Sequence, residues 1–281
     1  MQPVVQFTDA SLDYGQRSVW SELSLSFDAG SFVAILGPNG SGKTSFLRVI
    51  LGLTPLAEGS VRVLGLAPRR GNAGIGYVPQ HHSFERDLPL RGRDLVGLGI
   101  DGHRWGIGWP SRQRRRSVEA AIEGVHATQY ADAPIGRLSG GEQQRLRIAQ
   151  ALVGDPKLLL CDEPLASLDL HHQQEITELI NAWHGQTGRT VLFVTHDINP
   201  ILPLVNRVLF VVNGRWAAGS PDEILTSPLL SELYGSHVDV IRVHDRVVVV
   251  GDTTDAGFDL EQPHHLPAID DASHLRSGAR P

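Results

Sequence analysis

A glycine-rich segment near the N-terminus has the residue types and the spacing needed to hold phosphate groups. It fits the pattern G-x-x-x-x-G-K-[ST] and comprises Gly37, Pro38, Asn39, Gly40, Ser41, Gly42, Lys43, Thr44 and Ser45. Glycines let successive backbone N–H groups turn toward phosphate oxygens, the lysine reaches the β- and γ-phosphates, and the threonine hydroxyl suits Mg²⁺. The alternative is a turn that only caps a helix. Lys43 and Lys157 are the only lysines in the chain, so a chance match is rare.

Two carboxylates follow an apolar run in the second half of the chain. The run Leu158-Leu159-Leu160-Cys161 is followed by Asp162 and Glu163, as expected where a buried strand leaves the core. Such a strand would bring Asp162 beside the water shell of Mg²⁺ and place Glu163 where it can accept a proton from an attacking water. An acid pair after a strand means little alone, because strands commonly end in polar residues. Together with the glycine-rich segment, it predicts hydrolysis of a nucleotide.

Alternating strands and helices must position these residues. Residues 32–36 form an apolar run that leads directly into the glycine-rich segment, and residues 45–51 have helical spacing. Further strands are expected at residues 61–64, 75–78, 158–161, 190–195 and 208–212. This alternation predicts a parallel α/β sheet. By contrast, the alternating polarity of residues 4–9 and 22–27 predicts half-exposed antiparallel strands.

The alternation of strands and helices also indicates how the chain is divided into domains. We assign residues 1–87 and 157–233 to a nucleotide-binding α/β core and residues 88–156 to an inserted helical subdomain that contains the basic run 112–116. Residues 234–260 are expected to form a C-terminal β-hairpin extension, because two short apolar runs lie close together there. The polar remainder, residues 261–281, is expected to be a disordered tail.

A third segment carries a resemblance to a known family. Leu138-Ser139-Gly140-Gly141-Glu142-Gln143-Gln144-Arg145 is similar to the signature motif of ABC ATPases and lies between the other two motifs, as in that family. Ser139 suits a helix N-cap, Glu142 completes a capping box, and N–H groups of the glycine pair could contact an anion. The alternative is a helix cap without a ligand. The resemblance implies a P-loop NTPase (RecA-like) core with an N-terminal antiparallel β subdomain and an inserted α-helical subdomain.

The same resemblance implies roles for several single residues. Gln80 matches the glutamine that touches Mg²⁺ and the attacking water, and His196 matches the switch histidine that contacts the γ-phosphate and orients Glu163. Asp169 lies in a segment similar to the D-loop, and Tyr14 matches the aromatic residue that stacks on adenine. Without the family, these would be an ordinary surface glutamine, a polar residue at a strand end, a loop carboxylate and a packing tyrosine. The implied contacts of Mg²⁺ are Thr44, Gln80 and, through water, Asp162.

Each motif occurs once in the chain, and this has a consequence for assembly. The resemblance implies that Ser139, Gly140 and Gly141 act on ATP that another subunit holds. A complete site therefore needs two copies of the chain, or one copy and a homologous partner. We expect a head-to-tail dimer with ATP and Mg²⁺ at its interface and with hydrolysis separating the subunits.

Composition limits the partners and the compartment. The net charge of −6 argues against nucleic acid as a partner. The single cysteine, Cys161, excludes a disulfide framework and fits a reducing compartment. No apolar run approaches the ~18 residues needed to span a bilayer, so we expect a soluble chain. Membrane association would then run through an integral-membrane permease, with the chain peripheral on the cytoplasmic face of a bacterial cell membrane.

The cargo follows from resemblance alone. Residues 87–90, 94–96, 195–200 and 232–235 look like the importers of manganese or zinc, which receive the ion from an extracytoplasmic metal-binding protein. The importers of ferric siderophores and cobalamin share parts of this pattern and stay an alternative. Two other classes are a soluble ABC ATPase that remodels DNA or ribosomes and a module that binds nucleotide without hydrolysing it. The remodelling ATPases usually carry duplicated motifs or long coiled-coil insertions, and this sequence shows neither. Intact Glu163 argues against a module that binds nucleotide without hydrolysing it.

Histidine pairs raise the separate question of a metal site. His81-His82 and His171-His172 are adjacent in sequence, and adjacent side chains rarely point at one ion, so we interpret them as solvated histidines. The tail is a candidate regulatory metal sensor, through His264, His265, Asp270, Asp271 and His274.

Overall fold

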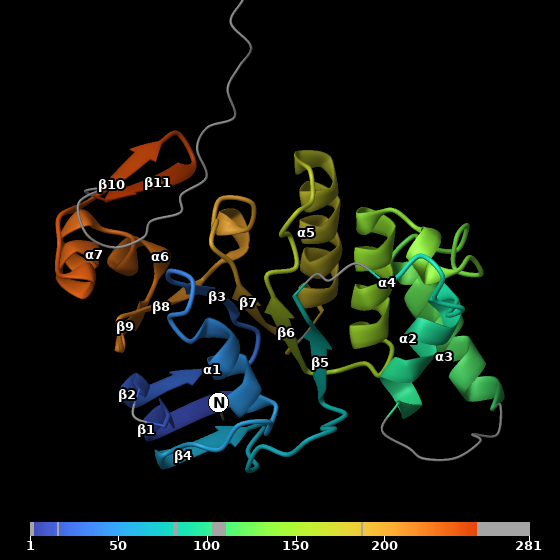
Figure 1. The fold of residues 1–281 in the computed structure, drawn as a ribbon, viewed down its shortest axis with the longest axis horizontal. Coiled ribbons are helices and arrows are strands. Elements are labelled where there is room, and N and C mark those ends of the chain that lie inside the picture. The colour runs from blue at the N-terminus through green and yellow to red at the C-terminus, as the bar shows by residue number, and fades with distance from the viewer. Residues whose placement is uncertain (1–2, 16, 81–83, 103–110, 187, 252–281) are drawn as a thin grey trace, which may run out of the picture.

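The computed structural model describes residues 3–15, 17–80, 84–102, 111–186 and 188–251. A six-stranded sheet runs through its centre in the order β5-β6-β7-β3-β8-β9 (Figure 1). Its strands are β3 (Phe32–Leu36), β5 (Ile75–Val78), β6 (Leu158–Asp162), β7 (Thr190–Val194), β8 (Arg207–Val212) and β9 (Arg215–Gly219). All neighbouring pairs are parallel except β8 and β9. The predicted α/β class is therefore confirmed, with one antiparallel edge strand added.

The edge strand β9 is missed by the prediction of a parallel sheet. Asn213 and Gly214, with φ values of 51° and 79°, connect β8 to β9 and bring Val212 opposite Arg215. Positive φ at both turn residues is favourable for Asn-Gly, and the resulting turn matches the twist of two antiparallel strands. The Asn-Gly pair between two apolar runs is thus the local signal for this strand.

A second sheet is antiparallel and covers the first helix. Its order is β2-β1-β4, and its strands are β1 (Val5–Tyr14), β2 (Arg17–Phe27) and β4 (Glu58–Val63). Helix α1 (Lys43–Ile50) lies against it, because Phe46 stacks on Phe7 of β1 with 4.8 Å between ring centroids. Ile35 of β3 belongs to the same hydrophobic cluster. Helix α1 therefore packs between the two sheets, and the glycine-rich segment is fixed at its start.

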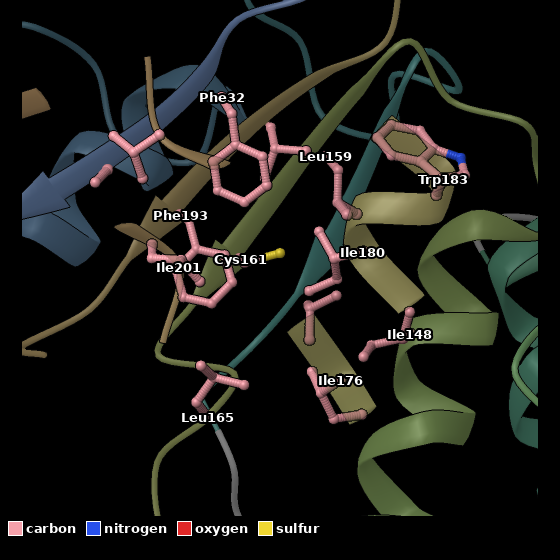
Figure 2. Packing of buried hydrophobic residues seen from close by; sticks show 14 of the residues in the cluster. Phe32, Ile148, Leu159, Cys161, Leu165, Ile176, Ile180, Trp183, Phe193 and Ile201 are labelled. Atoms are coloured by element: carbon pink, nitrogen blue, oxygen red, sulfur yellow. The ribbon is translucent and has the colours of Figure 1, made fainter. Parts of the chain in front are cut away.

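Three helices form a separate group beyond α5 (Leu170–His184) (Figure 1). They are α2 (Gly92–Asp101), α3 (Arg112–Gly124) and α4 (Gly140–Leu152), and the short 3-10 turn η1 (Ile135–Arg137) precedes α4. Figure 2 shows Ile148 of α4 beside Ile176 and Ile180 of α5. This apolar contact joins the helical group to the layer that covers the main sheet.

Strand β6 is buried on both faces. Leu159 and Cys161 face α5 and belong to one hydrophobic cluster (Figure 2), whereas Leu158 and Leu160 belong to the cluster around α1. A parallel strand that is covered on both faces has apolar residues at successive positions, because no face is exposed to solvent. Burial raises the pKa of the Cys161 thiol, so it is a neutral packing group. Charged residues of this segment can reach solvent only where the strand ends.

The C-terminal part of the described chain lies on the β8–β9 side of the main sheet (Figure 1). It contains α6 (Pro221–Ile224), α7 (Ser227–Tyr234) and the hairpin of β10 (Val238–Val243) and β11 (Arg246–Gly251), and the short turn η2 (Leu202–Leu204) follows β7. No helix among the described residues has the length and apolarity to cross a bilayer. His81, His82 and the tail, for which a disordered state and a metal sensor are predicted, lie outside the described residues.

We predict that Phe46→Ala lowers the free energy of unfolding by about 3–5 kcal/mol, because it leaves a cavity between the two sheets. Denaturant unfolding of the purified chain measures this change. Leu66, which is 64% exposed, supplies the control, and Leu66→Ala should change stability by less than about 0.5 kcal/mol. Equal effects of the two substitutions would contradict the packing described for α1.

Candidate functional site

The glycine loop, residues 37–42, joins β3 to α1 and depends on three glycines. Gly37, Gly40 and Gly42 have φ values of 142°, 77° and 101°, in the region that glycine adopts without strain. A Cβ at Gly37 would also collide with the carbonyl oxygen of Val211, and one at Gly42 with the side chain of Val19. The predicted glycine spacing is thus required by both backbone conformation and close packing.

Lys43 begins α1 and turns back across the loop. Its Nζ donates hydrogen bonds to the carbonyl oxygens of Gly37 at 2.7 Å and Pro38 at 2.9 Å, and the residue is 6% exposed. Burial lowers the pKa of this ammonium group, while Glu163 and Asp162 oppose the shift. The N-cap residue of α1 is Gly42, so no N-cap side chain accepts a hydrogen bond from the N–H groups of the first turn. A positive charge and uncapped helix N–H groups therefore face the same place, which favours an anion.

A buried carboxylate lies on the other side of Thr44. The Thr44 hydroxyl donates to Asp162 Oδ1 at 3.2 Å, and the Tyr77 hydroxyl donates to Asp162 Oδ2 at 3.4 Å. Burial raises the pKa of Asp162, and the hydrogen bond from Thr44 partly offsets this shift. A desolvated carboxylate beside a hydroxyl is a donor set that suits a hard divalent cation. The residues therefore fit the predicted Mg²⁺.

Glu163 occupies the first position after β6 in a strained conformation. Its φ is 48°, a region that non-glycine residues seldom adopt and that clusters at functional sites. Its Oε2 accepts a hydrogen bond from Gln80 Nε2 at 3.4 Å and lies 3.9 Å from His196 Nδ1. Gln80 and His196 come from segments that follow β5 and β7, the two neighbours of β6. The structure thus brings the three predicted catalytic residues together.

Tyr14 lies beside the glycine-rich segment at the end of β1. Its hydroxyl lies 3.3 Å from Ser45 Oγ, and the Ser45 hydroxyl, which can donate to the phenolate oxygen, is the main cause of the lowered pKa of the phenol. The residue is 47% exposed, so its ring is available to a ligand. Stacking on adenine, which the resemblance implies for Tyr14, stays a prediction.

The start of α4 has the predicted cap. Ser139 Oγ accepts from the Glu142 backbone N–H at 3.3 Å, and Glu142 Oε2 accepts from the Ser139 N–H at 2.8 Å. The capping box is therefore confirmed. Figure 1 shows strands β5 and β6 between α4 and α1. Ser139, Gly140 and Gly141 are thus not gathered around the glycine loop of their own chain.

Asp169 is the N-cap of α5. Its carboxylate accepts from the backbone N–H of His172 at 2.9 Å and lies 2.8 Å from His172 Nδ1, and these bonds hold the pKa of Asp169 below its usual range. The His172 ring also packs against Gly141, where a Cβ would collide with it. The segment similar to the D-loop and the segment similar to the signature motif therefore meet at this histidine.

Sequence reasoning misses Tyr77. Burial, and then the nearby Asp162, raise the pKa of this phenol to about 12, so it stays a neutral hydrogen-bond donor to the carboxylate. Its local signal is a polar aromatic residue in β5, the strand that ends two residues before Gln80. Within the described part of the chain, no group of three or more His, Cys, Asp or Glu side chains could hold a metal ion. His171 and His172 accordingly bind neighbouring carboxylates, those of Glu175 and Asp169.

Comparison with known proteins finds one family. A family model described as ABC transporter matches residues 20–166. The chain is 35% identical over 237 residues to the zinc transport system ATP-binding protein TroB of Treponema pallidum (strain Nichols), which covers 83% of this chain and 88% of TroB. It is 32% identical over 250 residues to the manganese transport system ATP-binding protein MntB of Bacillus subtilis (strain 168), which covers 88% of this chain and 98% of MntB.

A solved structure has a similar fold. It is the structure of a metal-chelate type ABC transporter in an inward-facing conformation, with a TM-score of 0.75 and 25% sequence identity. The superposition covers 89% of this chain and 97% of that chain. The similarity thus extends over both the sheets and the helical group.

We predict that Lys43→Ala weakens ATP binding by about ten- to a hundredfold, because one charged hydrogen-bond donor to the phosphates is lost. Titration calorimetry of the purified chain with ATP measures the change. The control is Lys157→Ala, which removes an exposed lysine immediately before β6 and should leave affinity unchanged. Unaltered ATP affinity in the Lys43 variant would refute its phosphate-binding role.

Proposed function

The chain belongs to the family of ABC transporter ATPases, and from this premise we propose that it hydrolyses ATP to drive import of manganese or zinc through a separate membrane permease. The observation that carries the catalytic part is the meeting of Gln80, Glu163 and His196 at the carboxyl ends of adjacent strands. These side chains lie next to the loop and helix terminus that suit phosphates. The cargo is proposed from the relatives.

Binding of the triphosphate is assigned to the glycine loop and Lys43. The loop N–H groups and the N-terminus of α1 attract negative charge. Lys43 now donates to carbonyl oxygens of Gly37 and Pro38, and phosphate oxygens would replace or share these acceptors. Tyr14 would stack on the adenine ring beside the loop.

Thr44 and Gln80 would contact Mg²⁺, and Asp162 would hold the ion through its water shell. The ion, when bound, supplies positive charge against the phosphate oxygens. The hydrogen bonds from Thr44 and Tyr77 keep both oxygens of Asp162 oriented. Asp162 is directed toward the site because β6 ends there and its preceding residues are buried.

Glu163 is proposed as the group that accepts the proton of the attacking water. The backbone strain at this residue and the contacts with Gln80 and His196 restrict its carboxylate to one region. Such positioning is the first requirement of a general base. His196, which is 59% exposed, would contact the γ-phosphate and orient Glu163.

A second copy of the chain would complete each site. Ser139, Gly140 and Gly141 start a helix whose N–H groups suit an anion, yet α4 is separated from the chain's own α1 (Figure 1). In a head-to-tail dimer, this segment and Asp169 would act on ATP bound by the partner. Loss of the γ-phosphate contacts after hydrolysis would let the copies separate.

The proposed setting is the cytoplasmic face of a bacterial cell membrane, with the chain bound to integral-membrane permease subunits. An extracytoplasmic metal-binding protein would deliver the ion to the permease. The names of the relatives TroB and MntB mention zinc and manganese, and this supports the proposed cargo. An importer of ferric siderophores or cobalamin is the second candidate, favoured by the similarity to a metal-chelate type transporter. The net charge of −6 disfavours action on nucleic acid.

We predict that Glu163→Gln lowers steady-state ATP hydrolysis by about a hundredfold or more, because the amide cannot accept the proton. ATP binding should persist, and with MgATP the variant should accumulate as a stable dimer. Phosphate release and light scattering measure the two effects. Glu178→Gln, at an exposed position of α5, is the control and should hydrolyse ATP normally. Unimpaired hydrolysis by the Glu163 variant sinks its assignment as the base.

We also predict that the native complex, purified from membranes, contains a multi-spanning permease. An affinity tag on this chain and identification of co-purified proteins by mass spectrometry provide the test. Transport of radioactive manganese, zinc or a metal chelate by the reconstituted complex then distinguishes the cargoes. Co-purification with ribosomes or DNA in place of a permease would contradict the transporter proposal.

A further inference from the structure

The C-terminal hairpin is packed on the loop that carries His196. One face of the hairpin is buried through Val238 and Val247, and both residues share a hydrophobic cluster with Ile198 and Ile201 of that loop. The loop begins where β7 ends and reaches His196 after one further residue. Val247 of the hairpin is also hydrogen-bonded to Asn199 of this loop, so the last described secondary structure of the chain is in direct contact with the segment of the switch histidine.

One side chain makes this contact directional. Asn199 Oδ1 accepts a hydrogen bond from the Val247 N–H at 2.8 Å, and Asn199 Nδ2 donates to the Val247 carbonyl oxygen at 3.0 Å. The side-chain amide thus bonds to β11 as a neighbouring strand would, with one donor and one acceptor. These bonds are partly buried, where an unpaired partner is unfavourable.

Asn199 is in turn bonded to the residue beside His196. Its backbone N–H and its Nδ2 both donate to Asp197 Oδ1, at 2.9 and 2.8 Å. On the other side, Thr195 Oγ1 donates to the Asp197 carbonyl oxygen at 2.7 Å and accepts from the Asp197 N–H at 3.1 Å. A continuous series of hydrogen bonds therefore runs from the end of β7, past His196, to β11.

The His196 side chain itself is weakly held. It is 59% exposed and lies 3.9 Å from the Glu163 carboxylate. Packing does not fix an exposed ring, so the position of His196 depends on the backbone of its loop. The backbone on both sides of His196 is fixed by the hydrogen bonds of Thr195, Asp197 and Asn199.

We infer that Asn199 is a positioning residue that ties the C-terminal hairpin to the loop of His196, so that the docked hairpin holds His196 opposite Glu163. The inference rests on the proposed role of His196 in hydrolysis and gives the C-terminal extension a part in that reaction. Asn199 acts through the loop and does not touch the glycine loop, so it affects turnover and leaves nucleotide binding alone.

Asn199→Ala should lower the kcat of ATP hydrolysis by about three- to tenfold, as expected for the loss of one or two positioning hydrogen bonds. The KM for ATP should change less than about twofold, since Lys43 and its loop are untouched. The matched control is Ser227→Ala. Ser227 Oγ accepts from the Val240 N–H at 2.8 Å and anchors the hairpin to α7, away from His196, so its loss should leave kcat unchanged.

A second variant removes the same bond from the other side. Val247→Pro deletes the N–H that donates to Asn199 while the asparagine stays in place, and proline is tolerated on an edge strand. Val247→Ala, which keeps the N–H, controls for the smaller side chain. Asn199→Ala and Val247→Pro should each lower kcat, and the double variant should be no slower than the slower single variant, because both break one contact.

The outcomes separate this inference from the proposed function. A kcat of Asn199→Ala equal to that of Ser227→Ala, or multiplicative effects in the double variant, overturns the role of Asn199. A loss of activity accompanied by a large rise in KM overturns it as well, because that is general damage to the site. His196→Ala is measured alongside: full activity in that variant would defeat the proposed function of His196, whereas its inactivity beside a normal Asn199→Ala defeats only the inference about Asn199.

Discussion

The parallel arrangement of buried strands is the constraint on which the site depends. Strands β5, β6 and β7 are neighbours with the same direction, and β6 is covered on both faces. Polar residues can then leave the core only at the strand ends, and the carboxyl ends of parallel strands meet at one edge of the sheet. Asp162, Glu163 and His196 gather there because the strands before them are apolar. The helix that follows β3 adds the phosphate-binding terminus at the same edge.

The electrostatics of this edge match the chemistry proposed for it. Burial lowers the pKa of Lys43 and raises that of Asp162, so both charges are held against a desolvation penalty. A triphosphate would stabilise the ammonium group, and a divalent cation would stabilise the carboxylate. The hydrogen bonds from Thr44 and Tyr77 keep the carboxylate oriented. Binding of a triphosphate and a divalent cation together would thus stabilise both buried charges of this site.

The structure also joins regions that the sequence keeps apart. His172 contacts both Asp169 and Gly141, and Arg145 forms an ion pair with Glu175 at 2.5 Å, so the starts of α4 and α5 are joined at two levels. Asn199 links the loop after β7 to the C-terminal hairpin. In both cases a polar side chain connects a proposed nucleotide-contacting segment to a neighbouring element. A movement of the neighbouring element would therefore displace the nucleotide-contacting segment to which it is bonded.

Local patterns in the sequence predicted much of this protein. The glycine spacing of residues 37–42 and the capping box of Ser139 and Glu142 are specified by residues a few positions apart. The apolar run before Asp162 likewise predicts a buried strand. The Asn213-Gly214 turn was equally local, although a parallel sheet was predicted without it. By contrast, the bond between Tyr77 and Asp162 and that between Asn199 and Val247 join residues 85 and 48 positions apart. Only the tertiary structure could decide these contacts, because a hydrogen bond depends on the distance between two atoms, and that distance is set by how whole strands and helices pack.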